Sequence, residues 1–371
     1  MKNFAYMEWQ KFFEQVPDFR LNRKKRHKLS DILMLSLCAV LSGADDFEEM
    51  ENYGKQKQAF LRTFLELPNG IPSHDTINRV YNHLDKYKFA DCLHKWSREL
   101  LDFIDYYQIN IDGKVLRATG KAGKKHSGIC LVSAWAQSQR LVLGQRKVEG
   151  KSNEKKAIPE LIDSLDLQGA LVSIDAIGCS EKMAASITYK GGDYLLSLKK
   201  NQKNVYEQVS EYMIKQKENL AKNEWIDFGS GRIEHRTAYI CEKLELLDDL
   251  ATWPAIKRVV MIEASREKDG KVQQETRFYL SSLSADVATF NRLVRNHWGI
   301  ENNLHWMLDV VFREDQSRTR KGNAPENLAT VRKTALQLLN QATDKESIKS
   351  RRKMAGWDDN YLINLLQKLR F

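Results

Sequence analysis

The stretch Gln108-Ile109-Asn110-Ile111-Asp112-Gly113-Lys114-Val115-Leu116-Arg117 decides how the rest of the chain is interpreted. Apolar and polar residues alternate through it, which is typical of a β-strand with one buried face. Before about residue 105 the apolar residues follow a helical period, so the strand pattern begins here. The stretch therefore predicts the first strand of an α/β domain and places a carboxylate, Asp112, within it.

Further strand and helix patterns follow this stretch in a definite order. We expect strands at about 107–116, 129–136 and 141–148, a helix at 153–165, a strand at 171–175, a helix at 180–189 and a strand at 194–198. The strand at 171–175 is wholly apolar until its last residue, which is the mark of a buried central strand. Three strands, helix, strand, helix, strand is the order of a ribonuclease H-like domain, with a mixed sheet covered on both faces.

The pattern divides the chain into three predicted parts. Residues 1–105 form an all-α N-terminal domain, which is a candidate for DNA binding. Residues 106–340 form the ribonuclease H-like domain, with a β-strand insertion at about 225–285. Residues 341–371 form a basic helical C-terminal tail.

One short helix in the N-terminal part has two interpretations. The segment 73–84 follows a Pro/Gly-rich turn and begins at Ser73 or Asp75, either of which can cap a helix. Its position after the turn resembles the recognition helix of a helix-turn-helix motif. It is equally well explained as one more amphipathic helix in a small bundle, and both interpretations stay open.

The composition favours a cytoplasmic protein that binds nucleic acid. The 371 residues carry a formal net charge of +10, which suggests an anionic polymer as partner. Basic runs such as 349–353 would bind phosphate, or they merely keep the surface solvated. The five scattered cysteines, the lack of an apolar leader and the lack of a membrane-length apolar run point to the cytoplasm and to no membrane partner. The chain contains neither a GxGxxG nor a Walker-type motif, which disfavours a nucleotide-binding oxidoreductase.

Three carboxylates lie where a functional interpretation competes with a structural one. Asp112 precedes Gly113 and would suit a turn, but its strand pattern makes that less fitting. Asp175 ends a buried strand, where an unpaired carboxylate is costly. Glu301 competes with every exposed helical glutamate, although its neighbours Trp298 and Trp306 indicate a largely buried segment.

Two strand-borne carboxylates followed by a helix-borne one are typical of sites that hold two divalent metal ions about 3.5–4 Å apart for phosphoryl transfer. In a ribonuclease H-like sheet, Asp112 and Asp175 would lie on neighbouring strands and repel each other unless a cation is bound. The hard oxygen ligands suit Mg²⁺, and Mn²⁺ can substitute. We therefore expect a two-metal site that acts on nucleic acid.

Three segments of the chain resemble the DDE transposases of bacterial insertion sequences. They are Ile111-Asp112-Gly113-Lys114, Ile174-Asp175-Ala176-Ile177-Gly178-Cys179 and His297-Trp298-Gly299-Ile300-Glu301-Asn302. More narrowly, the chain is similar to the H-repeat-associated proteins found beside Rhs elements. This resemblance runs nearly the whole length and includes the stretches 191–202 and 231–236.

The resemblance implies a ribonuclease H-like catalytic domain interrupted by a β insertion before the glutamate. It assigns catalysis and metal binding to Asp112, Asp175 and Glu301. The residues expected to contact DNA around them are Lys114, Arg117, Lys199, Lys200, Gln202, Arg232, Arg236, Arg295 and His297. The expected partner is double-stranded DNA, at element ends and at the target, bound by a homodimer that holds two ends together.

The surroundings of the glutamate depart from the pattern of related transposases. Those have a tyrosine seven residues before it, an arginine four before and a lysine seven after, where this chain has Val294, His297 and Leu308. His297 is one candidate to replace the arginine, and Arg292 and Arg295 are others. The nearby Asp309, Glu314 and Asp315 are alternative sources of the third metal ligand.

Three functions follow from these features. The first is a transposase that performs Mg²⁺-dependent DNA strand cleavage and strand transfer at insertion-sequence ends. The second is a transposase-derived DNA-binding protein that has lost catalysis, because the basic companions of Glu301 are missing. The third is a ribonuclease H-like nuclease of defence or repair, which would yield no joined product.

Overall fold

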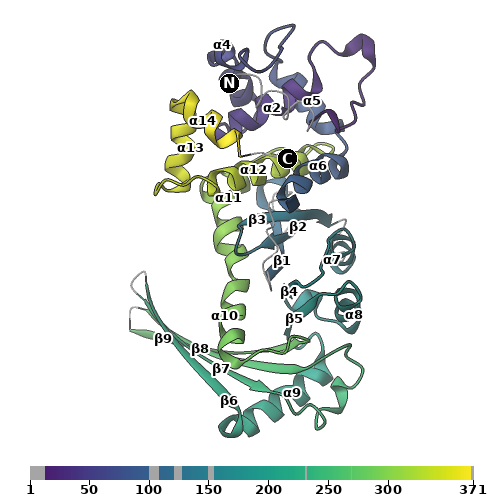
Figure 1. Ribbon diagram of the computed structural model, residues 1–371, viewed down its shortest axis with the longest axis vertical. Helices are drawn as coiled ribbons and strands as arrows, with labels where there is room; N and C mark the ends of the chain where they lie inside the picture. The colour runs from purple at the N-terminus through teal and green to yellow at the C-terminus, as the bar shows by residue number, and fades with distance from the viewer. Residues whose placement is uncertain are drawn as a thin grey trace.

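A computed structural model describes residues 13–99, 108–120, 128–148, 154–229, 232–268 and 270–368. It has three levels along its long axis: helices at one end, an α/β layer in the middle and a β arm at the other end (Figure 1). One nine-stranded sheet, in the order β3-β2-β1-β4-β5-β9-β8-β7-β6, runs through the middle level and the arm.

The helical level begins with α2 to α6. Their bounds are Leu29–Leu41 for α2, Phe47–Gln56 for α3, Gln58–Leu61 for α4, His74–His83 for α5 and Lys86–Glu99 for α6. Asp46 caps α3 and Ser73 caps α5, each by accepting a hydrogen bond from a backbone N–H of the first turn. The expected helix after the Pro/Gly turn is therefore present.

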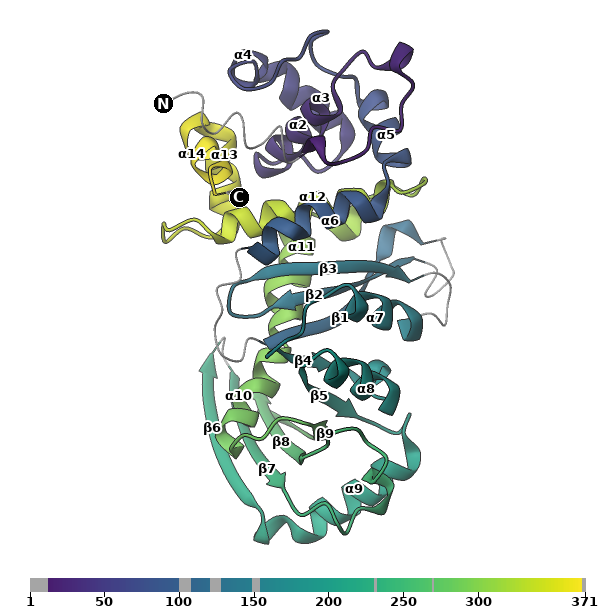
Figure 2. The same ribbon diagram turned by 45° about the vertical axis from the view of Figure 1, so that its right-hand side comes forward.

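The C-terminal helices complete the same core. These are α12 (Ala324–Asn340), α13 (Ile348–Trp357) and α14 (Asp359–Leu366), and their apolar residues share one hydrophobic cluster with α2 to α6. Figure 2 shows α12 lying beside α6, between the other helices and the sheet. The division of the chain at residues 105 and 340 stays a prediction, and the first boundary lies outside the described residues.

The basic run at 349–353 is only partly exposed, which corrects the expectation that it is a solvated or phosphate-binding surface. Arg351 and Arg352 are buried. The Arg352 guanidinium donates to the carbonyls of Val40 and Ala44 and to the Asp45 carboxylate, so it satisfies the end of α2. A buried guanidinium has five donors to satisfy, and carbonyls at a helix end provide acceptors.

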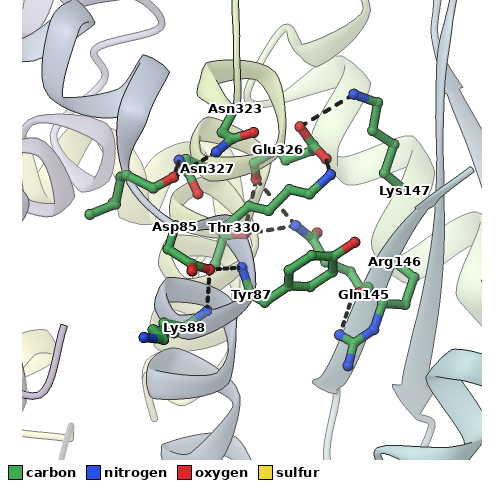
Figure 3. A network of polar contacts seen from close by, with 12 residues as sticks. Asp85, Tyr87, Lys88, Gln145, Arg146, Lys147, Asn323, Glu326, Asn327 and Thr330 are labelled. Atoms are coloured by element: carbon green, nitrogen blue, oxygen red, sulfur yellow. Dashed lines mark hydrogen bonds and ion pairs between the residues drawn. The ribbon is translucent and has the colours of Figure 1, made fainter. Parts of the chain in front are cut away.

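Figure 3 shows how the helical level is joined to the sheet, around Glu326 of α12. Its buried carboxylate lies 2.7 Å from Lys86 Nζ and 3.6 Å from Lys147 Nζ. The Gln145 amide of β3 donates to the Glu326 carbonyl and to the Thr330 hydroxyl. These ion pairs and amide hydrogen bonds together hold α12 against β3.

The middle level has the element order expected of a ribonuclease H-like domain, so this prediction is confirmed. Its strands are β1 (Gln108–Leu116), β2 (Ile129–Ala136), β3 (Leu141–Val148), β4 (Leu171–Ile174) and β5 (Asp193–Leu198). Helix α7 (Glu154–Asp163) follows β3, and α8 (Glu181–Tyr189) follows β4. Strands β1, β4 and β5 are parallel neighbours, and β2 and β3 pair antiparallel beyond β1.

The β insertion extends this sheet instead of forming a separate one. After α9 (Lys203–Gln216) come β6 (Ala221–Gly229), β7 (Arg232–Cys241), β8 (Arg258–Lys268) and β9 (Lys271–Ser281). Strand β9 pairs antiparallel with β5, which makes the arm continuous with the central strands.

A nearly continuous helical path then returns along one face of the sheet. It consists of α10 (Val287–His297), a π-helical turn η6 (Glu301–His305) and α11 (Trp306–Val310). Helices α7 and α8 cover the opposite face (Figures 1 and 2). Within the described ranges, no helix has the length and apolar character needed to cross a membrane.

Candidate active site

The two aspartates occupy equivalent positions on adjacent parallel strands. Ile111 of β1 is paired with Ile174 of β4, and each is followed directly by an aspartate, Asp112 or Asp175. Neighbouring strands are about 4.8 Å apart, so this register brings the two residues side by side at the carboxyl end of β4. Asp175 directly follows β4 and accepts a hydrogen bond from the Ile177 N–H, which fixes the turn that follows.

The alternation of side chains decides which face the aspartates share. Ile111 and Ile174 belong to the hydrophobic cluster that includes α7 and α8. Residues one position away point to the other face, as Asn110 and Ser173 do where they contact α10. Asp112 has the parity of Asn110, so it is directed toward the helical path that carries Glu301.

Polar side chains of the sheet hold α10 over this face. The Gln108 amide donates to the Leu293 carbonyl at 2.9 Å, and the Asn110 amide donates to the Asn296 carbonyl at 2.8 Å. Ser173 Oγ lies 2.8 Å from His297 Nδ1. Burial, and to a smaller extent the charge of Arg277, lower the pKa of His297 to about 4. His297 thus holds the helix on β4 as a neutral ring.

The π-turn follows directly and carries two groups of the site. The Trp306 N–H donates to the Glu301 carbonyl, which closes the turn with one residue more than an α-helix uses. His305 Nδ1 lies 3.4 Å from Asp112 Oδ2, and the imidazole is largely buried. Burial lowers the pKa of His305 to about 3, helped by the charges of Lys333 and Lys114.

Glu301 lies in a mixed electrostatic environment. Its side chain reaches solvent, yet partial burial raises the pKa of its carboxyl group; Arg277 opposes this rise and the charge of Asp175 adds to it. The Arg277 guanidinium of β9 lies 4.4 Å from the ring centroid of Trp298 and pairs with Glu275. The third carboxylate is therefore electrostatically coupled to Asp175, with a cation from the β insertion nearby.

Lys114 binds all three of the alternative carboxylates. Its Nζ lies 2.6 Å from Asp309, 3.0 Å from Glu314 and 3.3 Å from Asp315. Burial opposes ionisation of this amine, but the charge of Glu314 and the hydrogen bonds that Lys114 donates to Asp309 and Glu314 outweigh it and raise the pKa of Lys114. These carboxylates are engaged in an ion-pair cluster two residues beyond Asp112, which leaves Glu301 as the better candidate for the third ligand.

Lys333 of α12 is a second buried amine on the same face. It is 3% exposed and its Nζ donates to Ser133 Oγ and Gln145 Oε1, both at 2.7 Å. Ser133 is the cross-strand partner of Asp112. Burial lowers the pKa of Lys333 to about 8, while the charge of Glu314 acts in the other direction.

The remaining residues expected near DNA fall into two groups. Lys199 and Lys200 are exposed just beyond the carboxyl end of β5, and Arg117 is exposed beside Asp315. Gln202 instead donates to the Cys179 carbonyl and holds the loop after Asp175.

On the arm, Arg236 is buried, and Arg295 of α10 lies 3.5 Å from Asp227 of β6. The strand position of Arg232 is described, whereas its side chain lies outside the described part of the structure.

Sequence reasoning did not single out Arg277, His305 and Lys333. A lysine inside the apolar pattern of 324–340 was a usable signal for Lys333. Arg277 had none, because only the pairing of β9 with β5 brings it near Glu301. Conversely, Val294 and Leu308, which replace the tyrosine and lysine of related transposases, are core residues here.

The donors present are suited to a hard divalent cation, although they do not form a closed cage. Among the described residues, no three His, Cys, Asp or Glu side chains are grouped closely enough to hold a metal ion by themselves. Mg²⁺ commonly takes one or two protein carboxylates and completes its shell with water and substrate phosphate. The mutual repulsion of Asp175 and Glu301 is what such a cation would relieve.

Comparison with known proteins gives matches over most of the chain. The family model described as "Transposase DDE domain" matches residues 74–338, and the one described as "DDE_Tnp_1-associated" matches residues 10–97. The Escherichia coli (strain K12) protein named "H repeat-associated putative transposase YhhI" is 36% identical over 372 residues, covering 97% of this chain and 98% of that protein.

Two further matches cover different shares of the chain. An Escherichia coli (strain K12) protein named "Inactive transposase YbfQ" is 48% identical over 77 residues, which is 20% of this chain and 92% of that protein. A cryo-EM structure of a piggyBac transposase synaptic complex with hairpin DNA aligns with 97% of this chain and 76% of its own, at 12% identity and a TM-score of 0.46.

Proposed function

Because this chain belongs to the transposase DDE-domain family, we propose that it cleaves DNA at the ends of its own insertion sequence and transfers those ends to a target. The observation that carries the proposal is the paired register of β1 and β4. It places Asp112 and Asp175 side by side beneath the helical path that carries Glu301.

Asp112, Asp175 and Glu301 would hold the divalent ions, Mg²⁺ or Mn²⁺. Bound there, such ions supply activation of the attacking oxygen and stabilisation of the leaving oxygen in phosphoryl transfer. The protein's own task is to keep the three carboxylates ionised and aligned. The ladder between β1 and β4 aligns the aspartates, and the contacts of Gln108, Asn110 and Ser173 align the helix.

The exposed cations around the site are the proposed DNA contacts. Lys199 and Lys200 lie just beyond the end of β5, the strand next to β4, and Arg117 directly follows Leu116, the last residue of β1. Together with Arg295 and Arg232 they would bind phosphates without reading sequence. Arg277 would supply the positive charge that related transposases carry on the glutamate's own helix.

The other cations and amides of the expected set have positioning roles in this proposal. Lys114, Gln202, His297 and Arg236 are buried or engaged by protein groups. A phosphate would have to displace those partners, which costs more than binding at an exposed lysine. We expect a homodimer on double-stranded DNA in the cytoplasm, since two element ends must be held together before joining.

The direct test is a cleavage and strand-transfer assay on the DNA ends of the protein's own element. Wild-type protein should nick and join these ends with Mg²⁺ or Mn²⁺ and not with EDTA present. The Asp112→Ala and Asp175→Ala variants should do neither while still binding DNA. Undiminished cleavage by either variant would refute the site, and cleavage without joining would favour a nuclease.

A second candidate is a DNA-binding protein without catalysis. Burial of Val294 and Leu308 supports it, since the family's usual basic and aromatic companions of the glutamate are missing there. Tight binding to element ends with no nicking in Mg²⁺ or Mn²⁺ would favour this candidate. Metal-dependent nicking that needs Asp112 would exclude it.

A further inference from the structure

The π-turn at Glu301–His305 changes which residues of the helical path point at the sheet. We propose that His305 is a positioning residue that orients the Asp112 carboxylate, and that the π-turn serves to bring it there. This inference rests on the proposed function only where it predicts cleavage. The contact between His305 and Asp112 can be tested without any DNA.

Contacts with the sheet define a line of side chains along the helical path. His297 contacts Ser173 of β4, His305 contacts Asp112 of β1, and Asp309 contacts Lys114 of β1. Glu301 lies between the first two and is coupled electrostatically to Asp175. The sheet-facing line is therefore 297, 301, 305 and 309, with a constant spacing of four residues.

A regular α-helix cannot keep such a line facing one way. Each residue advances about 100° around an α-helix, so a spacing of four drifts by about 40° at every step. One extra residue in a turn corrects the accumulated drift by about 100°. Without it, Leu304 and Leu308 would continue the line that begins at His297, and His305 would be turned away from β1.

The buried residues show the same rotation from the other side. Phe290 and Val294, before the turn, pack in the cluster formed with the β arm. Ile300, directly before the turn, Leu304, within it, and Leu308, after it, are fully buried in the different cluster of the helical level. The turn therefore directs the two leucines toward the helical core and His305 toward Asp112.

Within this arrangement the His305 ring has one polar contact through Nδ1. Its side chain is 12% exposed, and Nδ1 lies 3.4 Å from Asp112 Oδ2. Nε2 is buried and has no hydrogen-bond partner in the described part of the protein. An N–H at the Nδ1 position, directed at Asp112 Oδ2, would hold this carboxylate in one rotation.

The test compares three substitutions in the full-length protein. Asparagine places an amide N–H near the Nδ1 position of histidine, whereas glutamine reaches the Nε2 position. We expect His305→Ala and His305→Gln to weaken Mn²⁺ binding, measured by electron paramagnetic resonance without DNA, by about 10–100-fold. His305→Asn should restore most of the affinity, and the same ranking should hold for cleavage. His235→Ala, a histidine 3.9 Å from Glu224 on the arm, is the matched control and should change neither.

A second readout stays informative if a variant folds poorly. In metal-free wild-type protein, the ¹⁵N shifts of the His305 ring should report a proton on Nδ1, and Asp112→Asn should change them. Unchanged shifts in Asp112→Asn, unchanged Mn²⁺ affinity in His305→Ala, or rescue by glutamine instead of asparagine would each overturn the inference. Failure of the proposed function is distinct, because it would appear as absent wild-type cleavage with these results intact.

Discussion

The two aspartates and the glutamate of the candidate site are positioned by different means. Asp112 and Asp175 are placed by the main-chain register of β1 and β4. Glu301 is placed by a few side-chain contacts between the sheet and the helical path. Main-chain ladders survive most substitutions, whereas a single side-chain change removes a whole contact. The glutamate's position should therefore be much more sensitive to mutation.

Lys114 links the two parts of the site. It lies on β1 two residues after Asp112, and its partners Asp309 and Glu314 follow Glu301 along the chain. The same cluster engages three further carboxylates and so keeps them from the proposed metal-binding positions. The aspartates held by the strands and the glutamate held by side-chain contacts should therefore respond differently to substitution.

The largest effect is expected at the aspartates themselves. Asp175→Asn should reduce strand cleavage on the order of 10³-fold or more, because a neutral amide is a poor ligand for Mg²⁺. The metal-free melting temperature should be unchanged or higher, since repulsion with Glu301 is relieved and the asparagine oxygen still accepts from Ile177. A large loss of metal-free stability would show that Asp175 is mainly structural.

Breaking the link at Lys114 should cost stability as well as activity. Lys114→Ala leaves Glu314, which is 1% exposed, without its cation, so we expect a loss of about 3–5 kcal/mol in unfolding free energy. Arg117→Ala is the matched control, because it removes an exposed cation from the same cluster at Asp315. Chemical denaturation should rank the two variants clearly; similar losses would contradict the linking role.

His297 should make the folding stability of the protein depend on pH. Its folded-state pKa is about 4, below the unfolded value near 6.5, so between these values the unfolded chain binds a proton that the folded protein does not. Stability should therefore fall as pH drops from about 6.5 toward 4. His297→Asn, which keeps a polar contact for Ser173, should lessen this slope by about one proton. Melting temperatures measured between about pH 4 and 6.5 test this prediction. An unchanged dependence of stability on pH in His297→Asn would show that His297 is not a neutral ring in the folded protein.

The smallest effect is expected at Arg277. Arg277→Ala removes a partly buried cation that lies over the Trp298 ring and close to Glu301. We expect it to raise the activation free energy of cleavage by about 1 kcal/mol, which lowers the cleavage rate roughly fivefold. Arg277→Lys should retain part of the activity because it keeps the charge. Lys182→Ala, which removes an exposed cation from α8 on the opposite face of the sheet, is the control. Equal effects of both alanine variants on cleavage would show that Arg277 has no specific role at the candidate site.

Much of the fold could be predicted from sequence, because its signals are local. Alternation in Gln108–Leu116 and the apolar run before Asp175 predicted β1 and β4, and the order of elements predicted the type of sheet. The pairing of β9 with β5 could not be predicted, since it depends on contacts between residues far apart in the chain. The continuity of the arm with the central sheet therefore became visible only in three dimensions.

For the candidate site, the local sequence signals reached only the three carboxylates. The carboxylates stand out because charged groups at the ends of buried strands are rare. The π-turn has no sequence signature of its own, and so the role of His305 could not be inferred from its position four residues after Glu301. Whether a lysine such as Lys114 faces DNA or carboxylates likewise depends on neighbours 195 to 201 residues away.

The most direct measurement is anomalous diffraction from crystals soaked in Mn²⁺. We expect metal peaks between Asp112, Asp175 and Glu301, with the Lys114 cluster free of metal. Peaks at Asp309, Glu314 and Asp315 instead, or no peak beside Asp112 and Asp175 at saturating Mn²⁺, would contradict it.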